Sequence, residues 1–139
     1  MKILIVEDEW KTLKGLSNLI AELGGEYEMI GQARSGEEGI RMAMELHPDI
    51  IITDIRMNGM TGLEMIKALN EEKLGCRYII LSGYAEFQYA KEAISLGSMD
   101  YLLKPITKEI LEESLRKVRT AIEEEAQNIR TSSMETPKS

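Results

Sequence analysis

The sequence has very few of the residues that build disulfides and zinc sites. Its 139 residues include one cysteine, Cys76, and one histidine, His47. A single cysteine excludes a disulfide within the chain, and zinc sites need several Cys or His ligands, so no zinc centre is expected. Long apolar runs are missing too, because no segment approaches the roughly 20 residues that a membrane-spanning helix needs.

Net charge and the N-terminal residues exclude further classes of protein. Asp and Glu number 24 against 17 Lys and Arg, which gives a net charge of −7. Such a chain is not expected to bind a polyanion on its own. The apolar run Ile3–Val6 is followed at once by Glu7 and is too short for the core of a signal peptide. With 43% hydrophobic residues the chain can form one core, so we expect a soluble, cytoplasmic domain.

Four short apolar runs are typical of buried strands, and a weaker one is typical of an edge strand. The four are rich in Ile, Leu and Val and do not alternate with polar residues, as expected in a parallel sheet covered on both faces. They are Ile3–Val6, Asp49–Thr53, Tyr78–Leu81 and Met99–Leu103, and the weaker one is Glu28–Ala33.

Apolar residues spaced by three and four predict a helix after each strand. Gly24 is expected to end the first helix, Ser35 and Glu38 to form a capping box on the second, and Thr107 to cap the last. The apolar positions of the five helices are Leu13, Leu16, Ile20 and Leu23; Ile40, Ala43 and Met44; Leu63, Ile66 and Leu69; Phe87, Ala90 and Ile94; Leu111, Leu115, Val118 and Ile122. Five β-α units with short connections predict a five-stranded parallel sheet in a doubly wound, flavodoxin-like sandwich of three layers.

The expected domain covers residues 1–122. Residues 123–139 are more polar, and we expect them to form a helical extension and a disordered tail. Two alternatives stay open for this extension. The apolar stripe could continue to Ile129 as a linker helix toward another domain, or the helix could fray soon after Ile122.

Polar residues follow four of the five expected strands. They are Glu7, Asp8, Asp54, Ser82 and Lys104. Because the carboxyl ends of parallel strands meet at one edge of a sheet, these side chains are expected to converge in one crevice. The strand that ends at Ala33 is expected to contribute nothing of this kind.

Three neighbouring carboxylates repel one another unless a cation neutralises them, and an all-oxygen ligand set selects Mg²⁺ or Mn²⁺. Such a site suits phosphoryl transfer. Asp54 is the best candidate nucleophile because an ionised carboxylate needs no separate base. Ser82 could donate a hydrogen bond to a phosphoryl oxygen and Lys104 could form an ion pair with another. The ordinary alternative is that these residues cap helices and line solvated turns.

These motifs together resemble the receiver (CheY-like) domain of two-component response regulators over about residues 2–122. The motifs are the acidic pair Glu7–Asp8, the segment Ile51–Met57 around Asp54, the step Leu81–Gly83 and the segment Asp100–Pro105.

The resemblance implies a role for each matching residue. Asp54 would be the phosphoacceptor, and Ser82 and Lys104 would bind the phosphoryl group. Tyr101 would change rotamer when Ser82 moves, and the Lys104–Pro105 peptide bond is expected to be cis. The implied cofactor is Mg²⁺, and its ligands would be Asp8, Asp54, the backbone carbonyl of Arg56 and, through water, Glu7.

The resemblance also implies partners. The phosphoryl donor would be a sensor histidine kinase, and phosphorylation could produce a homodimer. The segment Ser82–Ile94 resembles receivers that precede AraC-type DNA-binding domains, so DNA would be bound only through an output domain absent from this chain. No membrane partner is expected.

Three other functions compete with this interpretation. The chain could be a stand-alone receiver that docks on a target, or a pseudo-receiver that never takes phosphate. It could also be a Mg²⁺-dependent aspartyl phosphatase of the haloacid dehalogenase type, but that reaction needs a second acid two residues after the nucleophile, where this chain has Arg56. We therefore expect a regulatory domain that catalyses only its own phosphorylation and slow dephosphorylation.

The sequence departs from the family pattern at two positions. Asn58 stands where the family usually has proline, so the loop after Asp54 lacks the φ restraint of a proline ring. Glu7 stands where many members have Asp, which adds one methylene to its reach.

Overall fold

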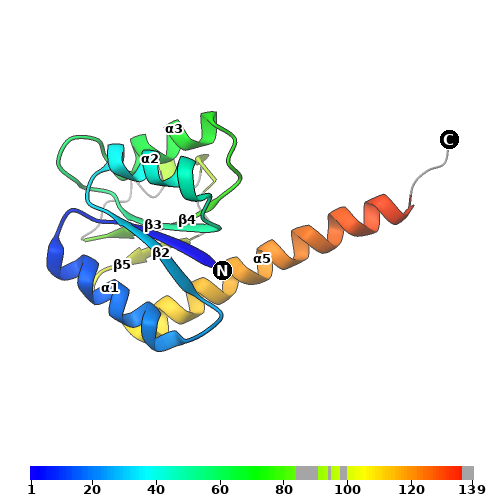
Figure 1. Ribbon diagram of the computed structural model, residues 1–139, viewed down its shortest axis with the longest axis horizontal. Coiled ribbons are helices and arrows are strands. Elements are labelled where there is room, and N and C mark those ends of the chain that lie inside the picture. The colour runs from blue at the N-terminus through cyan, green and yellow to red at the C-terminus, as the bar shows by residue number, and fades with distance from the viewer. Residues whose placement is uncertain (84–90, 94, 98–99, 136–139) are drawn as a thin grey trace.

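The protein folds around one parallel sheet with helices on both faces (Figure 1). The computed structural model describes residues 1–83, 91–93, 95–97 and 100–135. The strand order is β2-β1-β3-β4-β5, and every neighbouring pair is parallel. The strands are β1 (Lys2–Val6), β2 (Glu28–Ala33), β3 (Ile50–Asp54), β4 (Arg77–Ser82) and β5 (Asp100–Leu103). The predicted doubly wound fold is confirmed, and the weakly predicted strand β2 lies at one edge.

Four of the helical segments in the described residues form the outer layers. Helices α1 (Trp10–Leu23) and α5 (Lys108–Glu135) cover one face of the sheet, and α2 (Gly36–Leu46) and α3 (Gly62–Glu71) cover the other (Figure 1). The helix expected through Phe87, Ala90 and Ile94 and the expected strand start at Met99 fall outside the described residues.

The strands are apolar on both sides because both faces of the sheet are buried. In β1, Ile3 and Ile5 pack in the cluster under α1 and α5, whereas Leu4 and Val6 pack in the cluster under α2 and α3. All four side chains are fully buried. The continuous apolar runs in the sequence therefore come from a two-faced sheet, as predicted.

Helix α2 contacts the sheet through small residues, which corrects one expectation. Its buried positions are Gly36, Gly39 and Ala43. A Cβ at Gly39 would lie 2.7 Å from Sδ of Met65 and 3.0 Å from a methyl group of Val6, so a larger residue there would make these side chains shift. Met44, expected in the core, is 42% exposed because the helix turns this small-residue face inward.

The helix ends follow local capping rules. Ser35 Oγ accepts a hydrogen bond from the backbone N–H of Glu38, which is one half of the capping box expected there. The complete reciprocal pair forms instead between Thr61 and Glu64 at the start of α3, a signal that the sequence reasoning missed. Thr107 Oγ1 accepts from Ile110 N–H as α5 begins.

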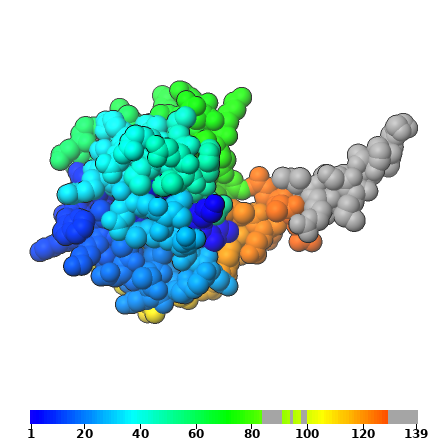
Figure 2. All heavy atoms as spheres, in the orientation of Figure 1, coloured from blue at the N-terminus to red at the C-terminus, as the bar shows by residue number. Residues whose placement is uncertain are grey.

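Helix α5 continues far beyond the sheet that it covers. Leu111, Leu115 and Val118 are fully buried, and Ile122 is the last of this predicted stripe to pack against the core. After that point the helix projects from the rounded body and continues to Glu135 (Figures 1 and 2). No helix in the described part of the chain is both long and apolar enough to cross a membrane.

Candidate functional site

Four strands deliver polar side chains to the carboxyl edge of the sheet. Glu7 and Asp8 directly follow β1, Asp54 and Ser82 are the last residues of β3 and β4, and Lys104 follows β5. The register aligns these ends, since Asp54 pairs with Leu81 and Ser82 pairs with Leu103. The backbone N–H of Lys104 also donates to the carbonyl of Ser82 at 2.8 Å.

The centre of the crevice is one ammonium between two buried carboxylates. Lys104 Nζ lies 2.6 Å from Asp54 Oδ2 and 3.3 Å from Glu7 Oε1. Glu7 is 1% exposed and Asp54 is 8% exposed. Lys104 lies 50 positions from Asp54 and 97 positions from Glu7 in the sequence, yet the three side chains form one charged cluster.

The pKa values of this cluster reflect burial as well as charge. Burial, followed by the charge of Asp54, raises the pKa of Glu7 from 4.5 to about 7, although Lys104 acts in the opposite direction. Burial alone would lower the pKa of Lys104, but its hydrogen bond and charge interaction with Asp54, together with Glu7, leave that pKa raised. Burial and the charge of Asp54 together therefore outweigh the effect of Lys104 on the pKa of Glu7.

Asp8 lies outside this lysine cluster and is held by other partners. Its Oδ2 accepts a hydrogen bond from the backbone N–H of Asn58 at 3.0 Å. Its backbone carbonyl accepts from Arg34 Nη2 at 3.1 Å, and the Arg34 guanidinium lies 5.8 Å from the centre of the Trp10 ring. The prediction that the end of β2 contributes nothing to this edge is therefore incomplete, because Arg34 directly follows β2.

The donor chemistry of the crevice fits a hard divalent cation, but its side chains are not gathered around one. Carboxylate and carbonyl oxygens are the ligands that Mg²⁺ prefers, and the crevice offers the carboxylates of Glu7, Asp8 and Asp54. Within the described ranges, no three His, Cys, Asp or Glu side chains form a group that could hold a metal. In this arrangement Lys104 bridges two of the carboxylates, and the third faces Asn58.

The remaining predicted residues lie around Asp54. The backbone N–H of Arg56 donates to Asp54 Oδ1 at 3.3 Å. Ser82 is buried, and its hydroxyl donates to the carbonyl of Gly83 at 3.0 Å. Tyr101 is partly buried and packs against the core under α2 and α3. The Lys104–Pro105 peptide bond is cis.

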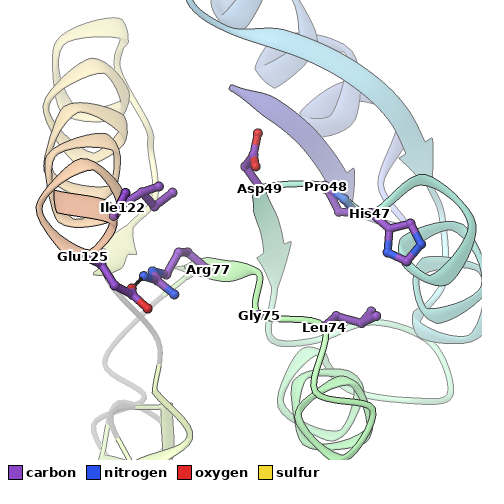
Figure 3. A pocket seen from close by; sticks show the side chains of 9 residues that line it. His47, Pro48, Asp49, Leu74, Gly75, Arg77, Ile122 and Glu125 are labelled. Atoms are coloured by element: carbon purple, nitrogen blue, oxygen red, sulfur yellow. Dashed lines mark ion pairs between the residues drawn. The ribbon is translucent and has the colours of Figure 1, made fainter. Parts of the chain in front are cut away.

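One hollow lies beside the crevice and another lies against α5. An apolar groove of about 630 Å³ runs between α1 and the segment Lys104–Ile106, beside the crevice. The other hollow, of about 330 Å³, lies at the opposite edge of the sheet (Figure 3). There Arg77, at the start of β4, forms an ion pair with Glu125 of α5. The second hollow is therefore remote from the carboxylates of the crevice, and its ion pair connects α5 to the start of β4.

Comparisons with known proteins agree with this geometry. A family model described as the response regulator receiver domain matches residues 3–116. The chain is 38% identical over 117 residues to the uncharacterized transcriptional regulatory protein YesN of Bacillus subtilis, covering 84% of this chain and 32% of that protein. It is 44% identical over 110 residues to the transcriptional regulatory protein YdfI of the same organism, covering 79% and 51%.

A solved structure shares both fold and sequence. The REC domain of AraT, a response regulator from Geobacillus stearothermophilus, is 36% identical with a TM-score of 0.81, and the match covers 90% of this chain and 97% of that one. The chain spans about a third to a half of the length of the curated relatives described above.

Proposed function

The chain belongs to the response regulator receiver family, and from this premise we propose that Asp54 is the phosphoacceptor of a phosphorylation-controlled switch. The observation that carries the proposal is the ion pair between Lys104 Nζ and Asp54 Oδ2 at 2.6 Å, in a crevice formed by strand ends. The carboxylate of Asp54 lies at the end of β3 beside Lys104, where it could act as the nucleophile without a separate base.

The transfer itself needs little from the protein beyond placement and charge. An oxygen of the Asp54 carboxylate attacks the phosphorus of a phosphohistidine, the new O–P bond forms, and the P–N bond breaks. The departing imidazole nitrogen keeps the electron pair and is protonated. Lys104 then pairs with a phosphoryl oxygen, and the Ser82 hydroxyl donates a hydrogen bond to another.

We also propose that Mg²⁺ is the cofactor. Asp8, Asp54 and the carbonyl of Arg56 would be its ligands, with Glu7 acting through water. When bound, the ion would neutralise the charge of the carboxylates and of the incoming phosphoryl group. The pKa of Glu7 is raised first by burial and then by the charge of Asp54, and a cation bound beside these carboxylates would favour their ionised forms.

The switch would begin at Ser82 and continue to Tyr101. A new phosphoryl group on Asp54 adds charge and acceptor oxygens, which would draw the Ser82 hydroxyl inward and let the Tyr101 ring change rotamer. Tyr101 is partly buried and packs against the cluster under α2 and α3. The surface of β5 and α5 would then contact a different partner.

We propose that the output is transcription, through a DNA-binding domain of AraC type absent from this chain. The relatives that bear the name transcriptional regulatory protein are two to three times longer than the matched region. The long helix α5 suits a connection to such a domain. The donor would be a cytoplasmic sensor histidine kinase, and phosphorylation would favour a homodimer.

Intact mass spectrometry tests the proposal. The protein is incubated with acetyl phosphate and Mg²⁺, alongside Asp54→Asn. The wild type should gain the mass of one phosphoryl group and the variant should gain none. Equal labelling of both proteins, or an unmodified wild type, would refute the assignment.

Two of the rival functions give different results in the same assay. A pseudo-receiver stays unmodified with every donor, and its full-length regulator works equally well with Asp54→Asn. A phosphatase turns over phosphomonoesters repeatedly, which Arg56 does not support because it stands where a general acid is needed.

A further inference from the structure

A backbone N–H in the loop between β3 and α3 donates a hydrogen bond to a side chain at the end of β1. The backbone N–H of Asn58 donates to Asp8 Oδ2 at 3.0 Å, across 50 positions of sequence. Any residue except proline can supply this N–H. The bond therefore depends on the departure noted above, in which Asn58 replaces the usual proline.

The hydrogen bond leaves one oxygen of the Asp8 carboxylate available. Among the described residues, the side-chain hydrogen bond to Asp8 goes to Oδ2, whereas Arg34 contacts the backbone carbonyl of Asp8. The Asp8 side chain is thus held at one oxygen while the residue is held at its main chain. A carboxylate fixed in this way loses less rotamer freedom when its other oxygen binds a cation.

We propose that the Asn58 main-chain N–H is a positioning group that orients Asp8 for Mg²⁺. The inference rests on the proposed function, in which Asp8 is a metal ligand. Carboxylates that bind a metal are themselves hydrogen-bonded, and removal of such a partner lowers metal affinity by about 10- to 100-fold. Because this bond is solvent-exposed, the lower end of that range applies.

Two substitutions at one position separate the N–H from the side chain. Asn58→Pro removes the N–H, and Asn58→Ala keeps it while removing the side-chain amide. His47 and Lys73 are the non-glycine residues with positive φ in the described part of the chain, so Asn58 does not have the positive φ that a proline could not adopt. Thermal unfolding in EDTA establishes that each variant is folded.

The experiment is a titration with Mg²⁺ alone, followed by amide NMR. The dissociation constant should rise about tenfold in Asn58→Pro and stay within twofold of the wild type in Asn58→Ala. If Asn58→Pro binds Mg²⁺ as tightly as the wild type, or more tightly, the positioning role is refuted. Equal weakening by both variants refutes it too, because the side chain would then be responsible.

A third variant distinguishes failure of this inference from failure of the proposed function. Asp8→Asn should abolish Mg²⁺ binding at concentrations that saturate the wild type. If it binds normally, the assignment of Asp8 as a ligand is wrong. If Asp8→Asn loses binding while Asn58→Pro keeps it, only the positioning role fails.

Amide exchange of the wild type supplies a test that needs no proline variant. The Asn58 N–H should stay protected from exchange with solvent both without Mg²⁺ and at saturating Mg²⁺. Loss of protection when Mg²⁺ binds would show that the hydrogen bond competes with the metal, which overturns the inference.

Discussion

Gly62 is the position where one added methyl group should most directly disturb the candidate site. It is the first residue of α3, and its N–H donates to the carbonyl of Ile55 at 2.8 Å. A Cβ on Gly62 would lie 2.1 Å from the backbone carbonyl oxygen of Asp54 and 3.1 Å from Thr53 Oγ1. Gly62→Ala therefore forces the start of α3 against the backbone of the proposed phosphoacceptor.

The size of the effect follows from this geometry. Carbon and oxygen atoms approach no closer than about 3.3 Å in even the tightest favourable contacts, so about 1 Å of movement is needed. The position of the Cβ is fixed by the backbone of residue 62 and the oxygen belongs to the backbone of Asp54, so no rotamer change relieves the overlap. We expect a loss of about 3 kcal/mol in the free energy of unfolding, at the upper end for an overpacked core, and slower phosphorylation of Asp54.

Gly15→Ala is the matched control. Gly15 lies inside α1, and nothing lies within 4 Å of a Cβ built there. This substitution should stabilise the protein by up to about 1 kcal/mol through helix propensity alone. Urea denaturation measures both variants, and acetyl phosphate labelling followed by mass spectrometry measures the rate. If the free energy of unfolding of Gly62→Ala lies within about 0.5 kcal/mol of the wild-type value, the close approach of Gly62 to Asp54 does not limit which residue can stand at position 62.

Three other predictions follow from the burial and the ion pairs. In EDTA, the Glu7 carboxyl keeps a proton in the folded state up to about pH 7 but loses it near pH 4.5 when unfolded, so its stabilising contribution falls as pH rises between these values. The free energy of unfolding, measured with urea, should therefore fall by roughly 3 kcal/mol across that range in the wild type, and Glu7→Gln should remove this decline. Parallel pH profiles of the two proteins would contradict the prediction. Leu4→Ala empties a fully buried position in β1 and should cost about 3 kcal/mol in the same assay, whereas a cost below about 1 kcal/mol would mean that the core collapses around it. Arg77→Ala removes the ion pair with Glu125, whose side chain is 55% exposed, so stability should change by less than about 1 kcal/mol while amide exchange around residue 125 becomes faster; unchanged exchange would show that the pair does not attach α5.

Sequence reasoning predicted the strands well because burial on both faces leaves a strong local pattern. The expected strand Ile3–Val6 is observed as Lys2–Val6, and Glu28–Ala33 is observed with the same bounds. It was wrong about Met44, which is exposed. Spacing alone did not reveal that α2 approaches the sheet through Gly36 and Gly39.

The sequence predicted that these polar residues lie at neighbouring strand ends, but it did not predict which side chains pair. The positions of Asp54 and Lys104 at strand ends could be deduced because each follows an apolar run directly. That Lys104 bridges Asp54 and Glu7 could not, because this depends on ångström-scale placement of side chains from separate strands. The role of Arg34 was missed because nothing near it in the sequence indicates Asp8 as its partner.

Local chemistry along the chain was enough to determine which segments are strands and which polar groups stand at their ends. Periodicity and residue order are properties of residues that are close in the sequence, so they can be recognised without the three-dimensional structure. Only the folded chain decided which charges meet, how deeply Glu7 is buried and where Asn58 directs its N–H. Those properties depend on distances between segments about 50 to 100 residues apart and on the exclusion of water, and neither is set by any short stretch of sequence.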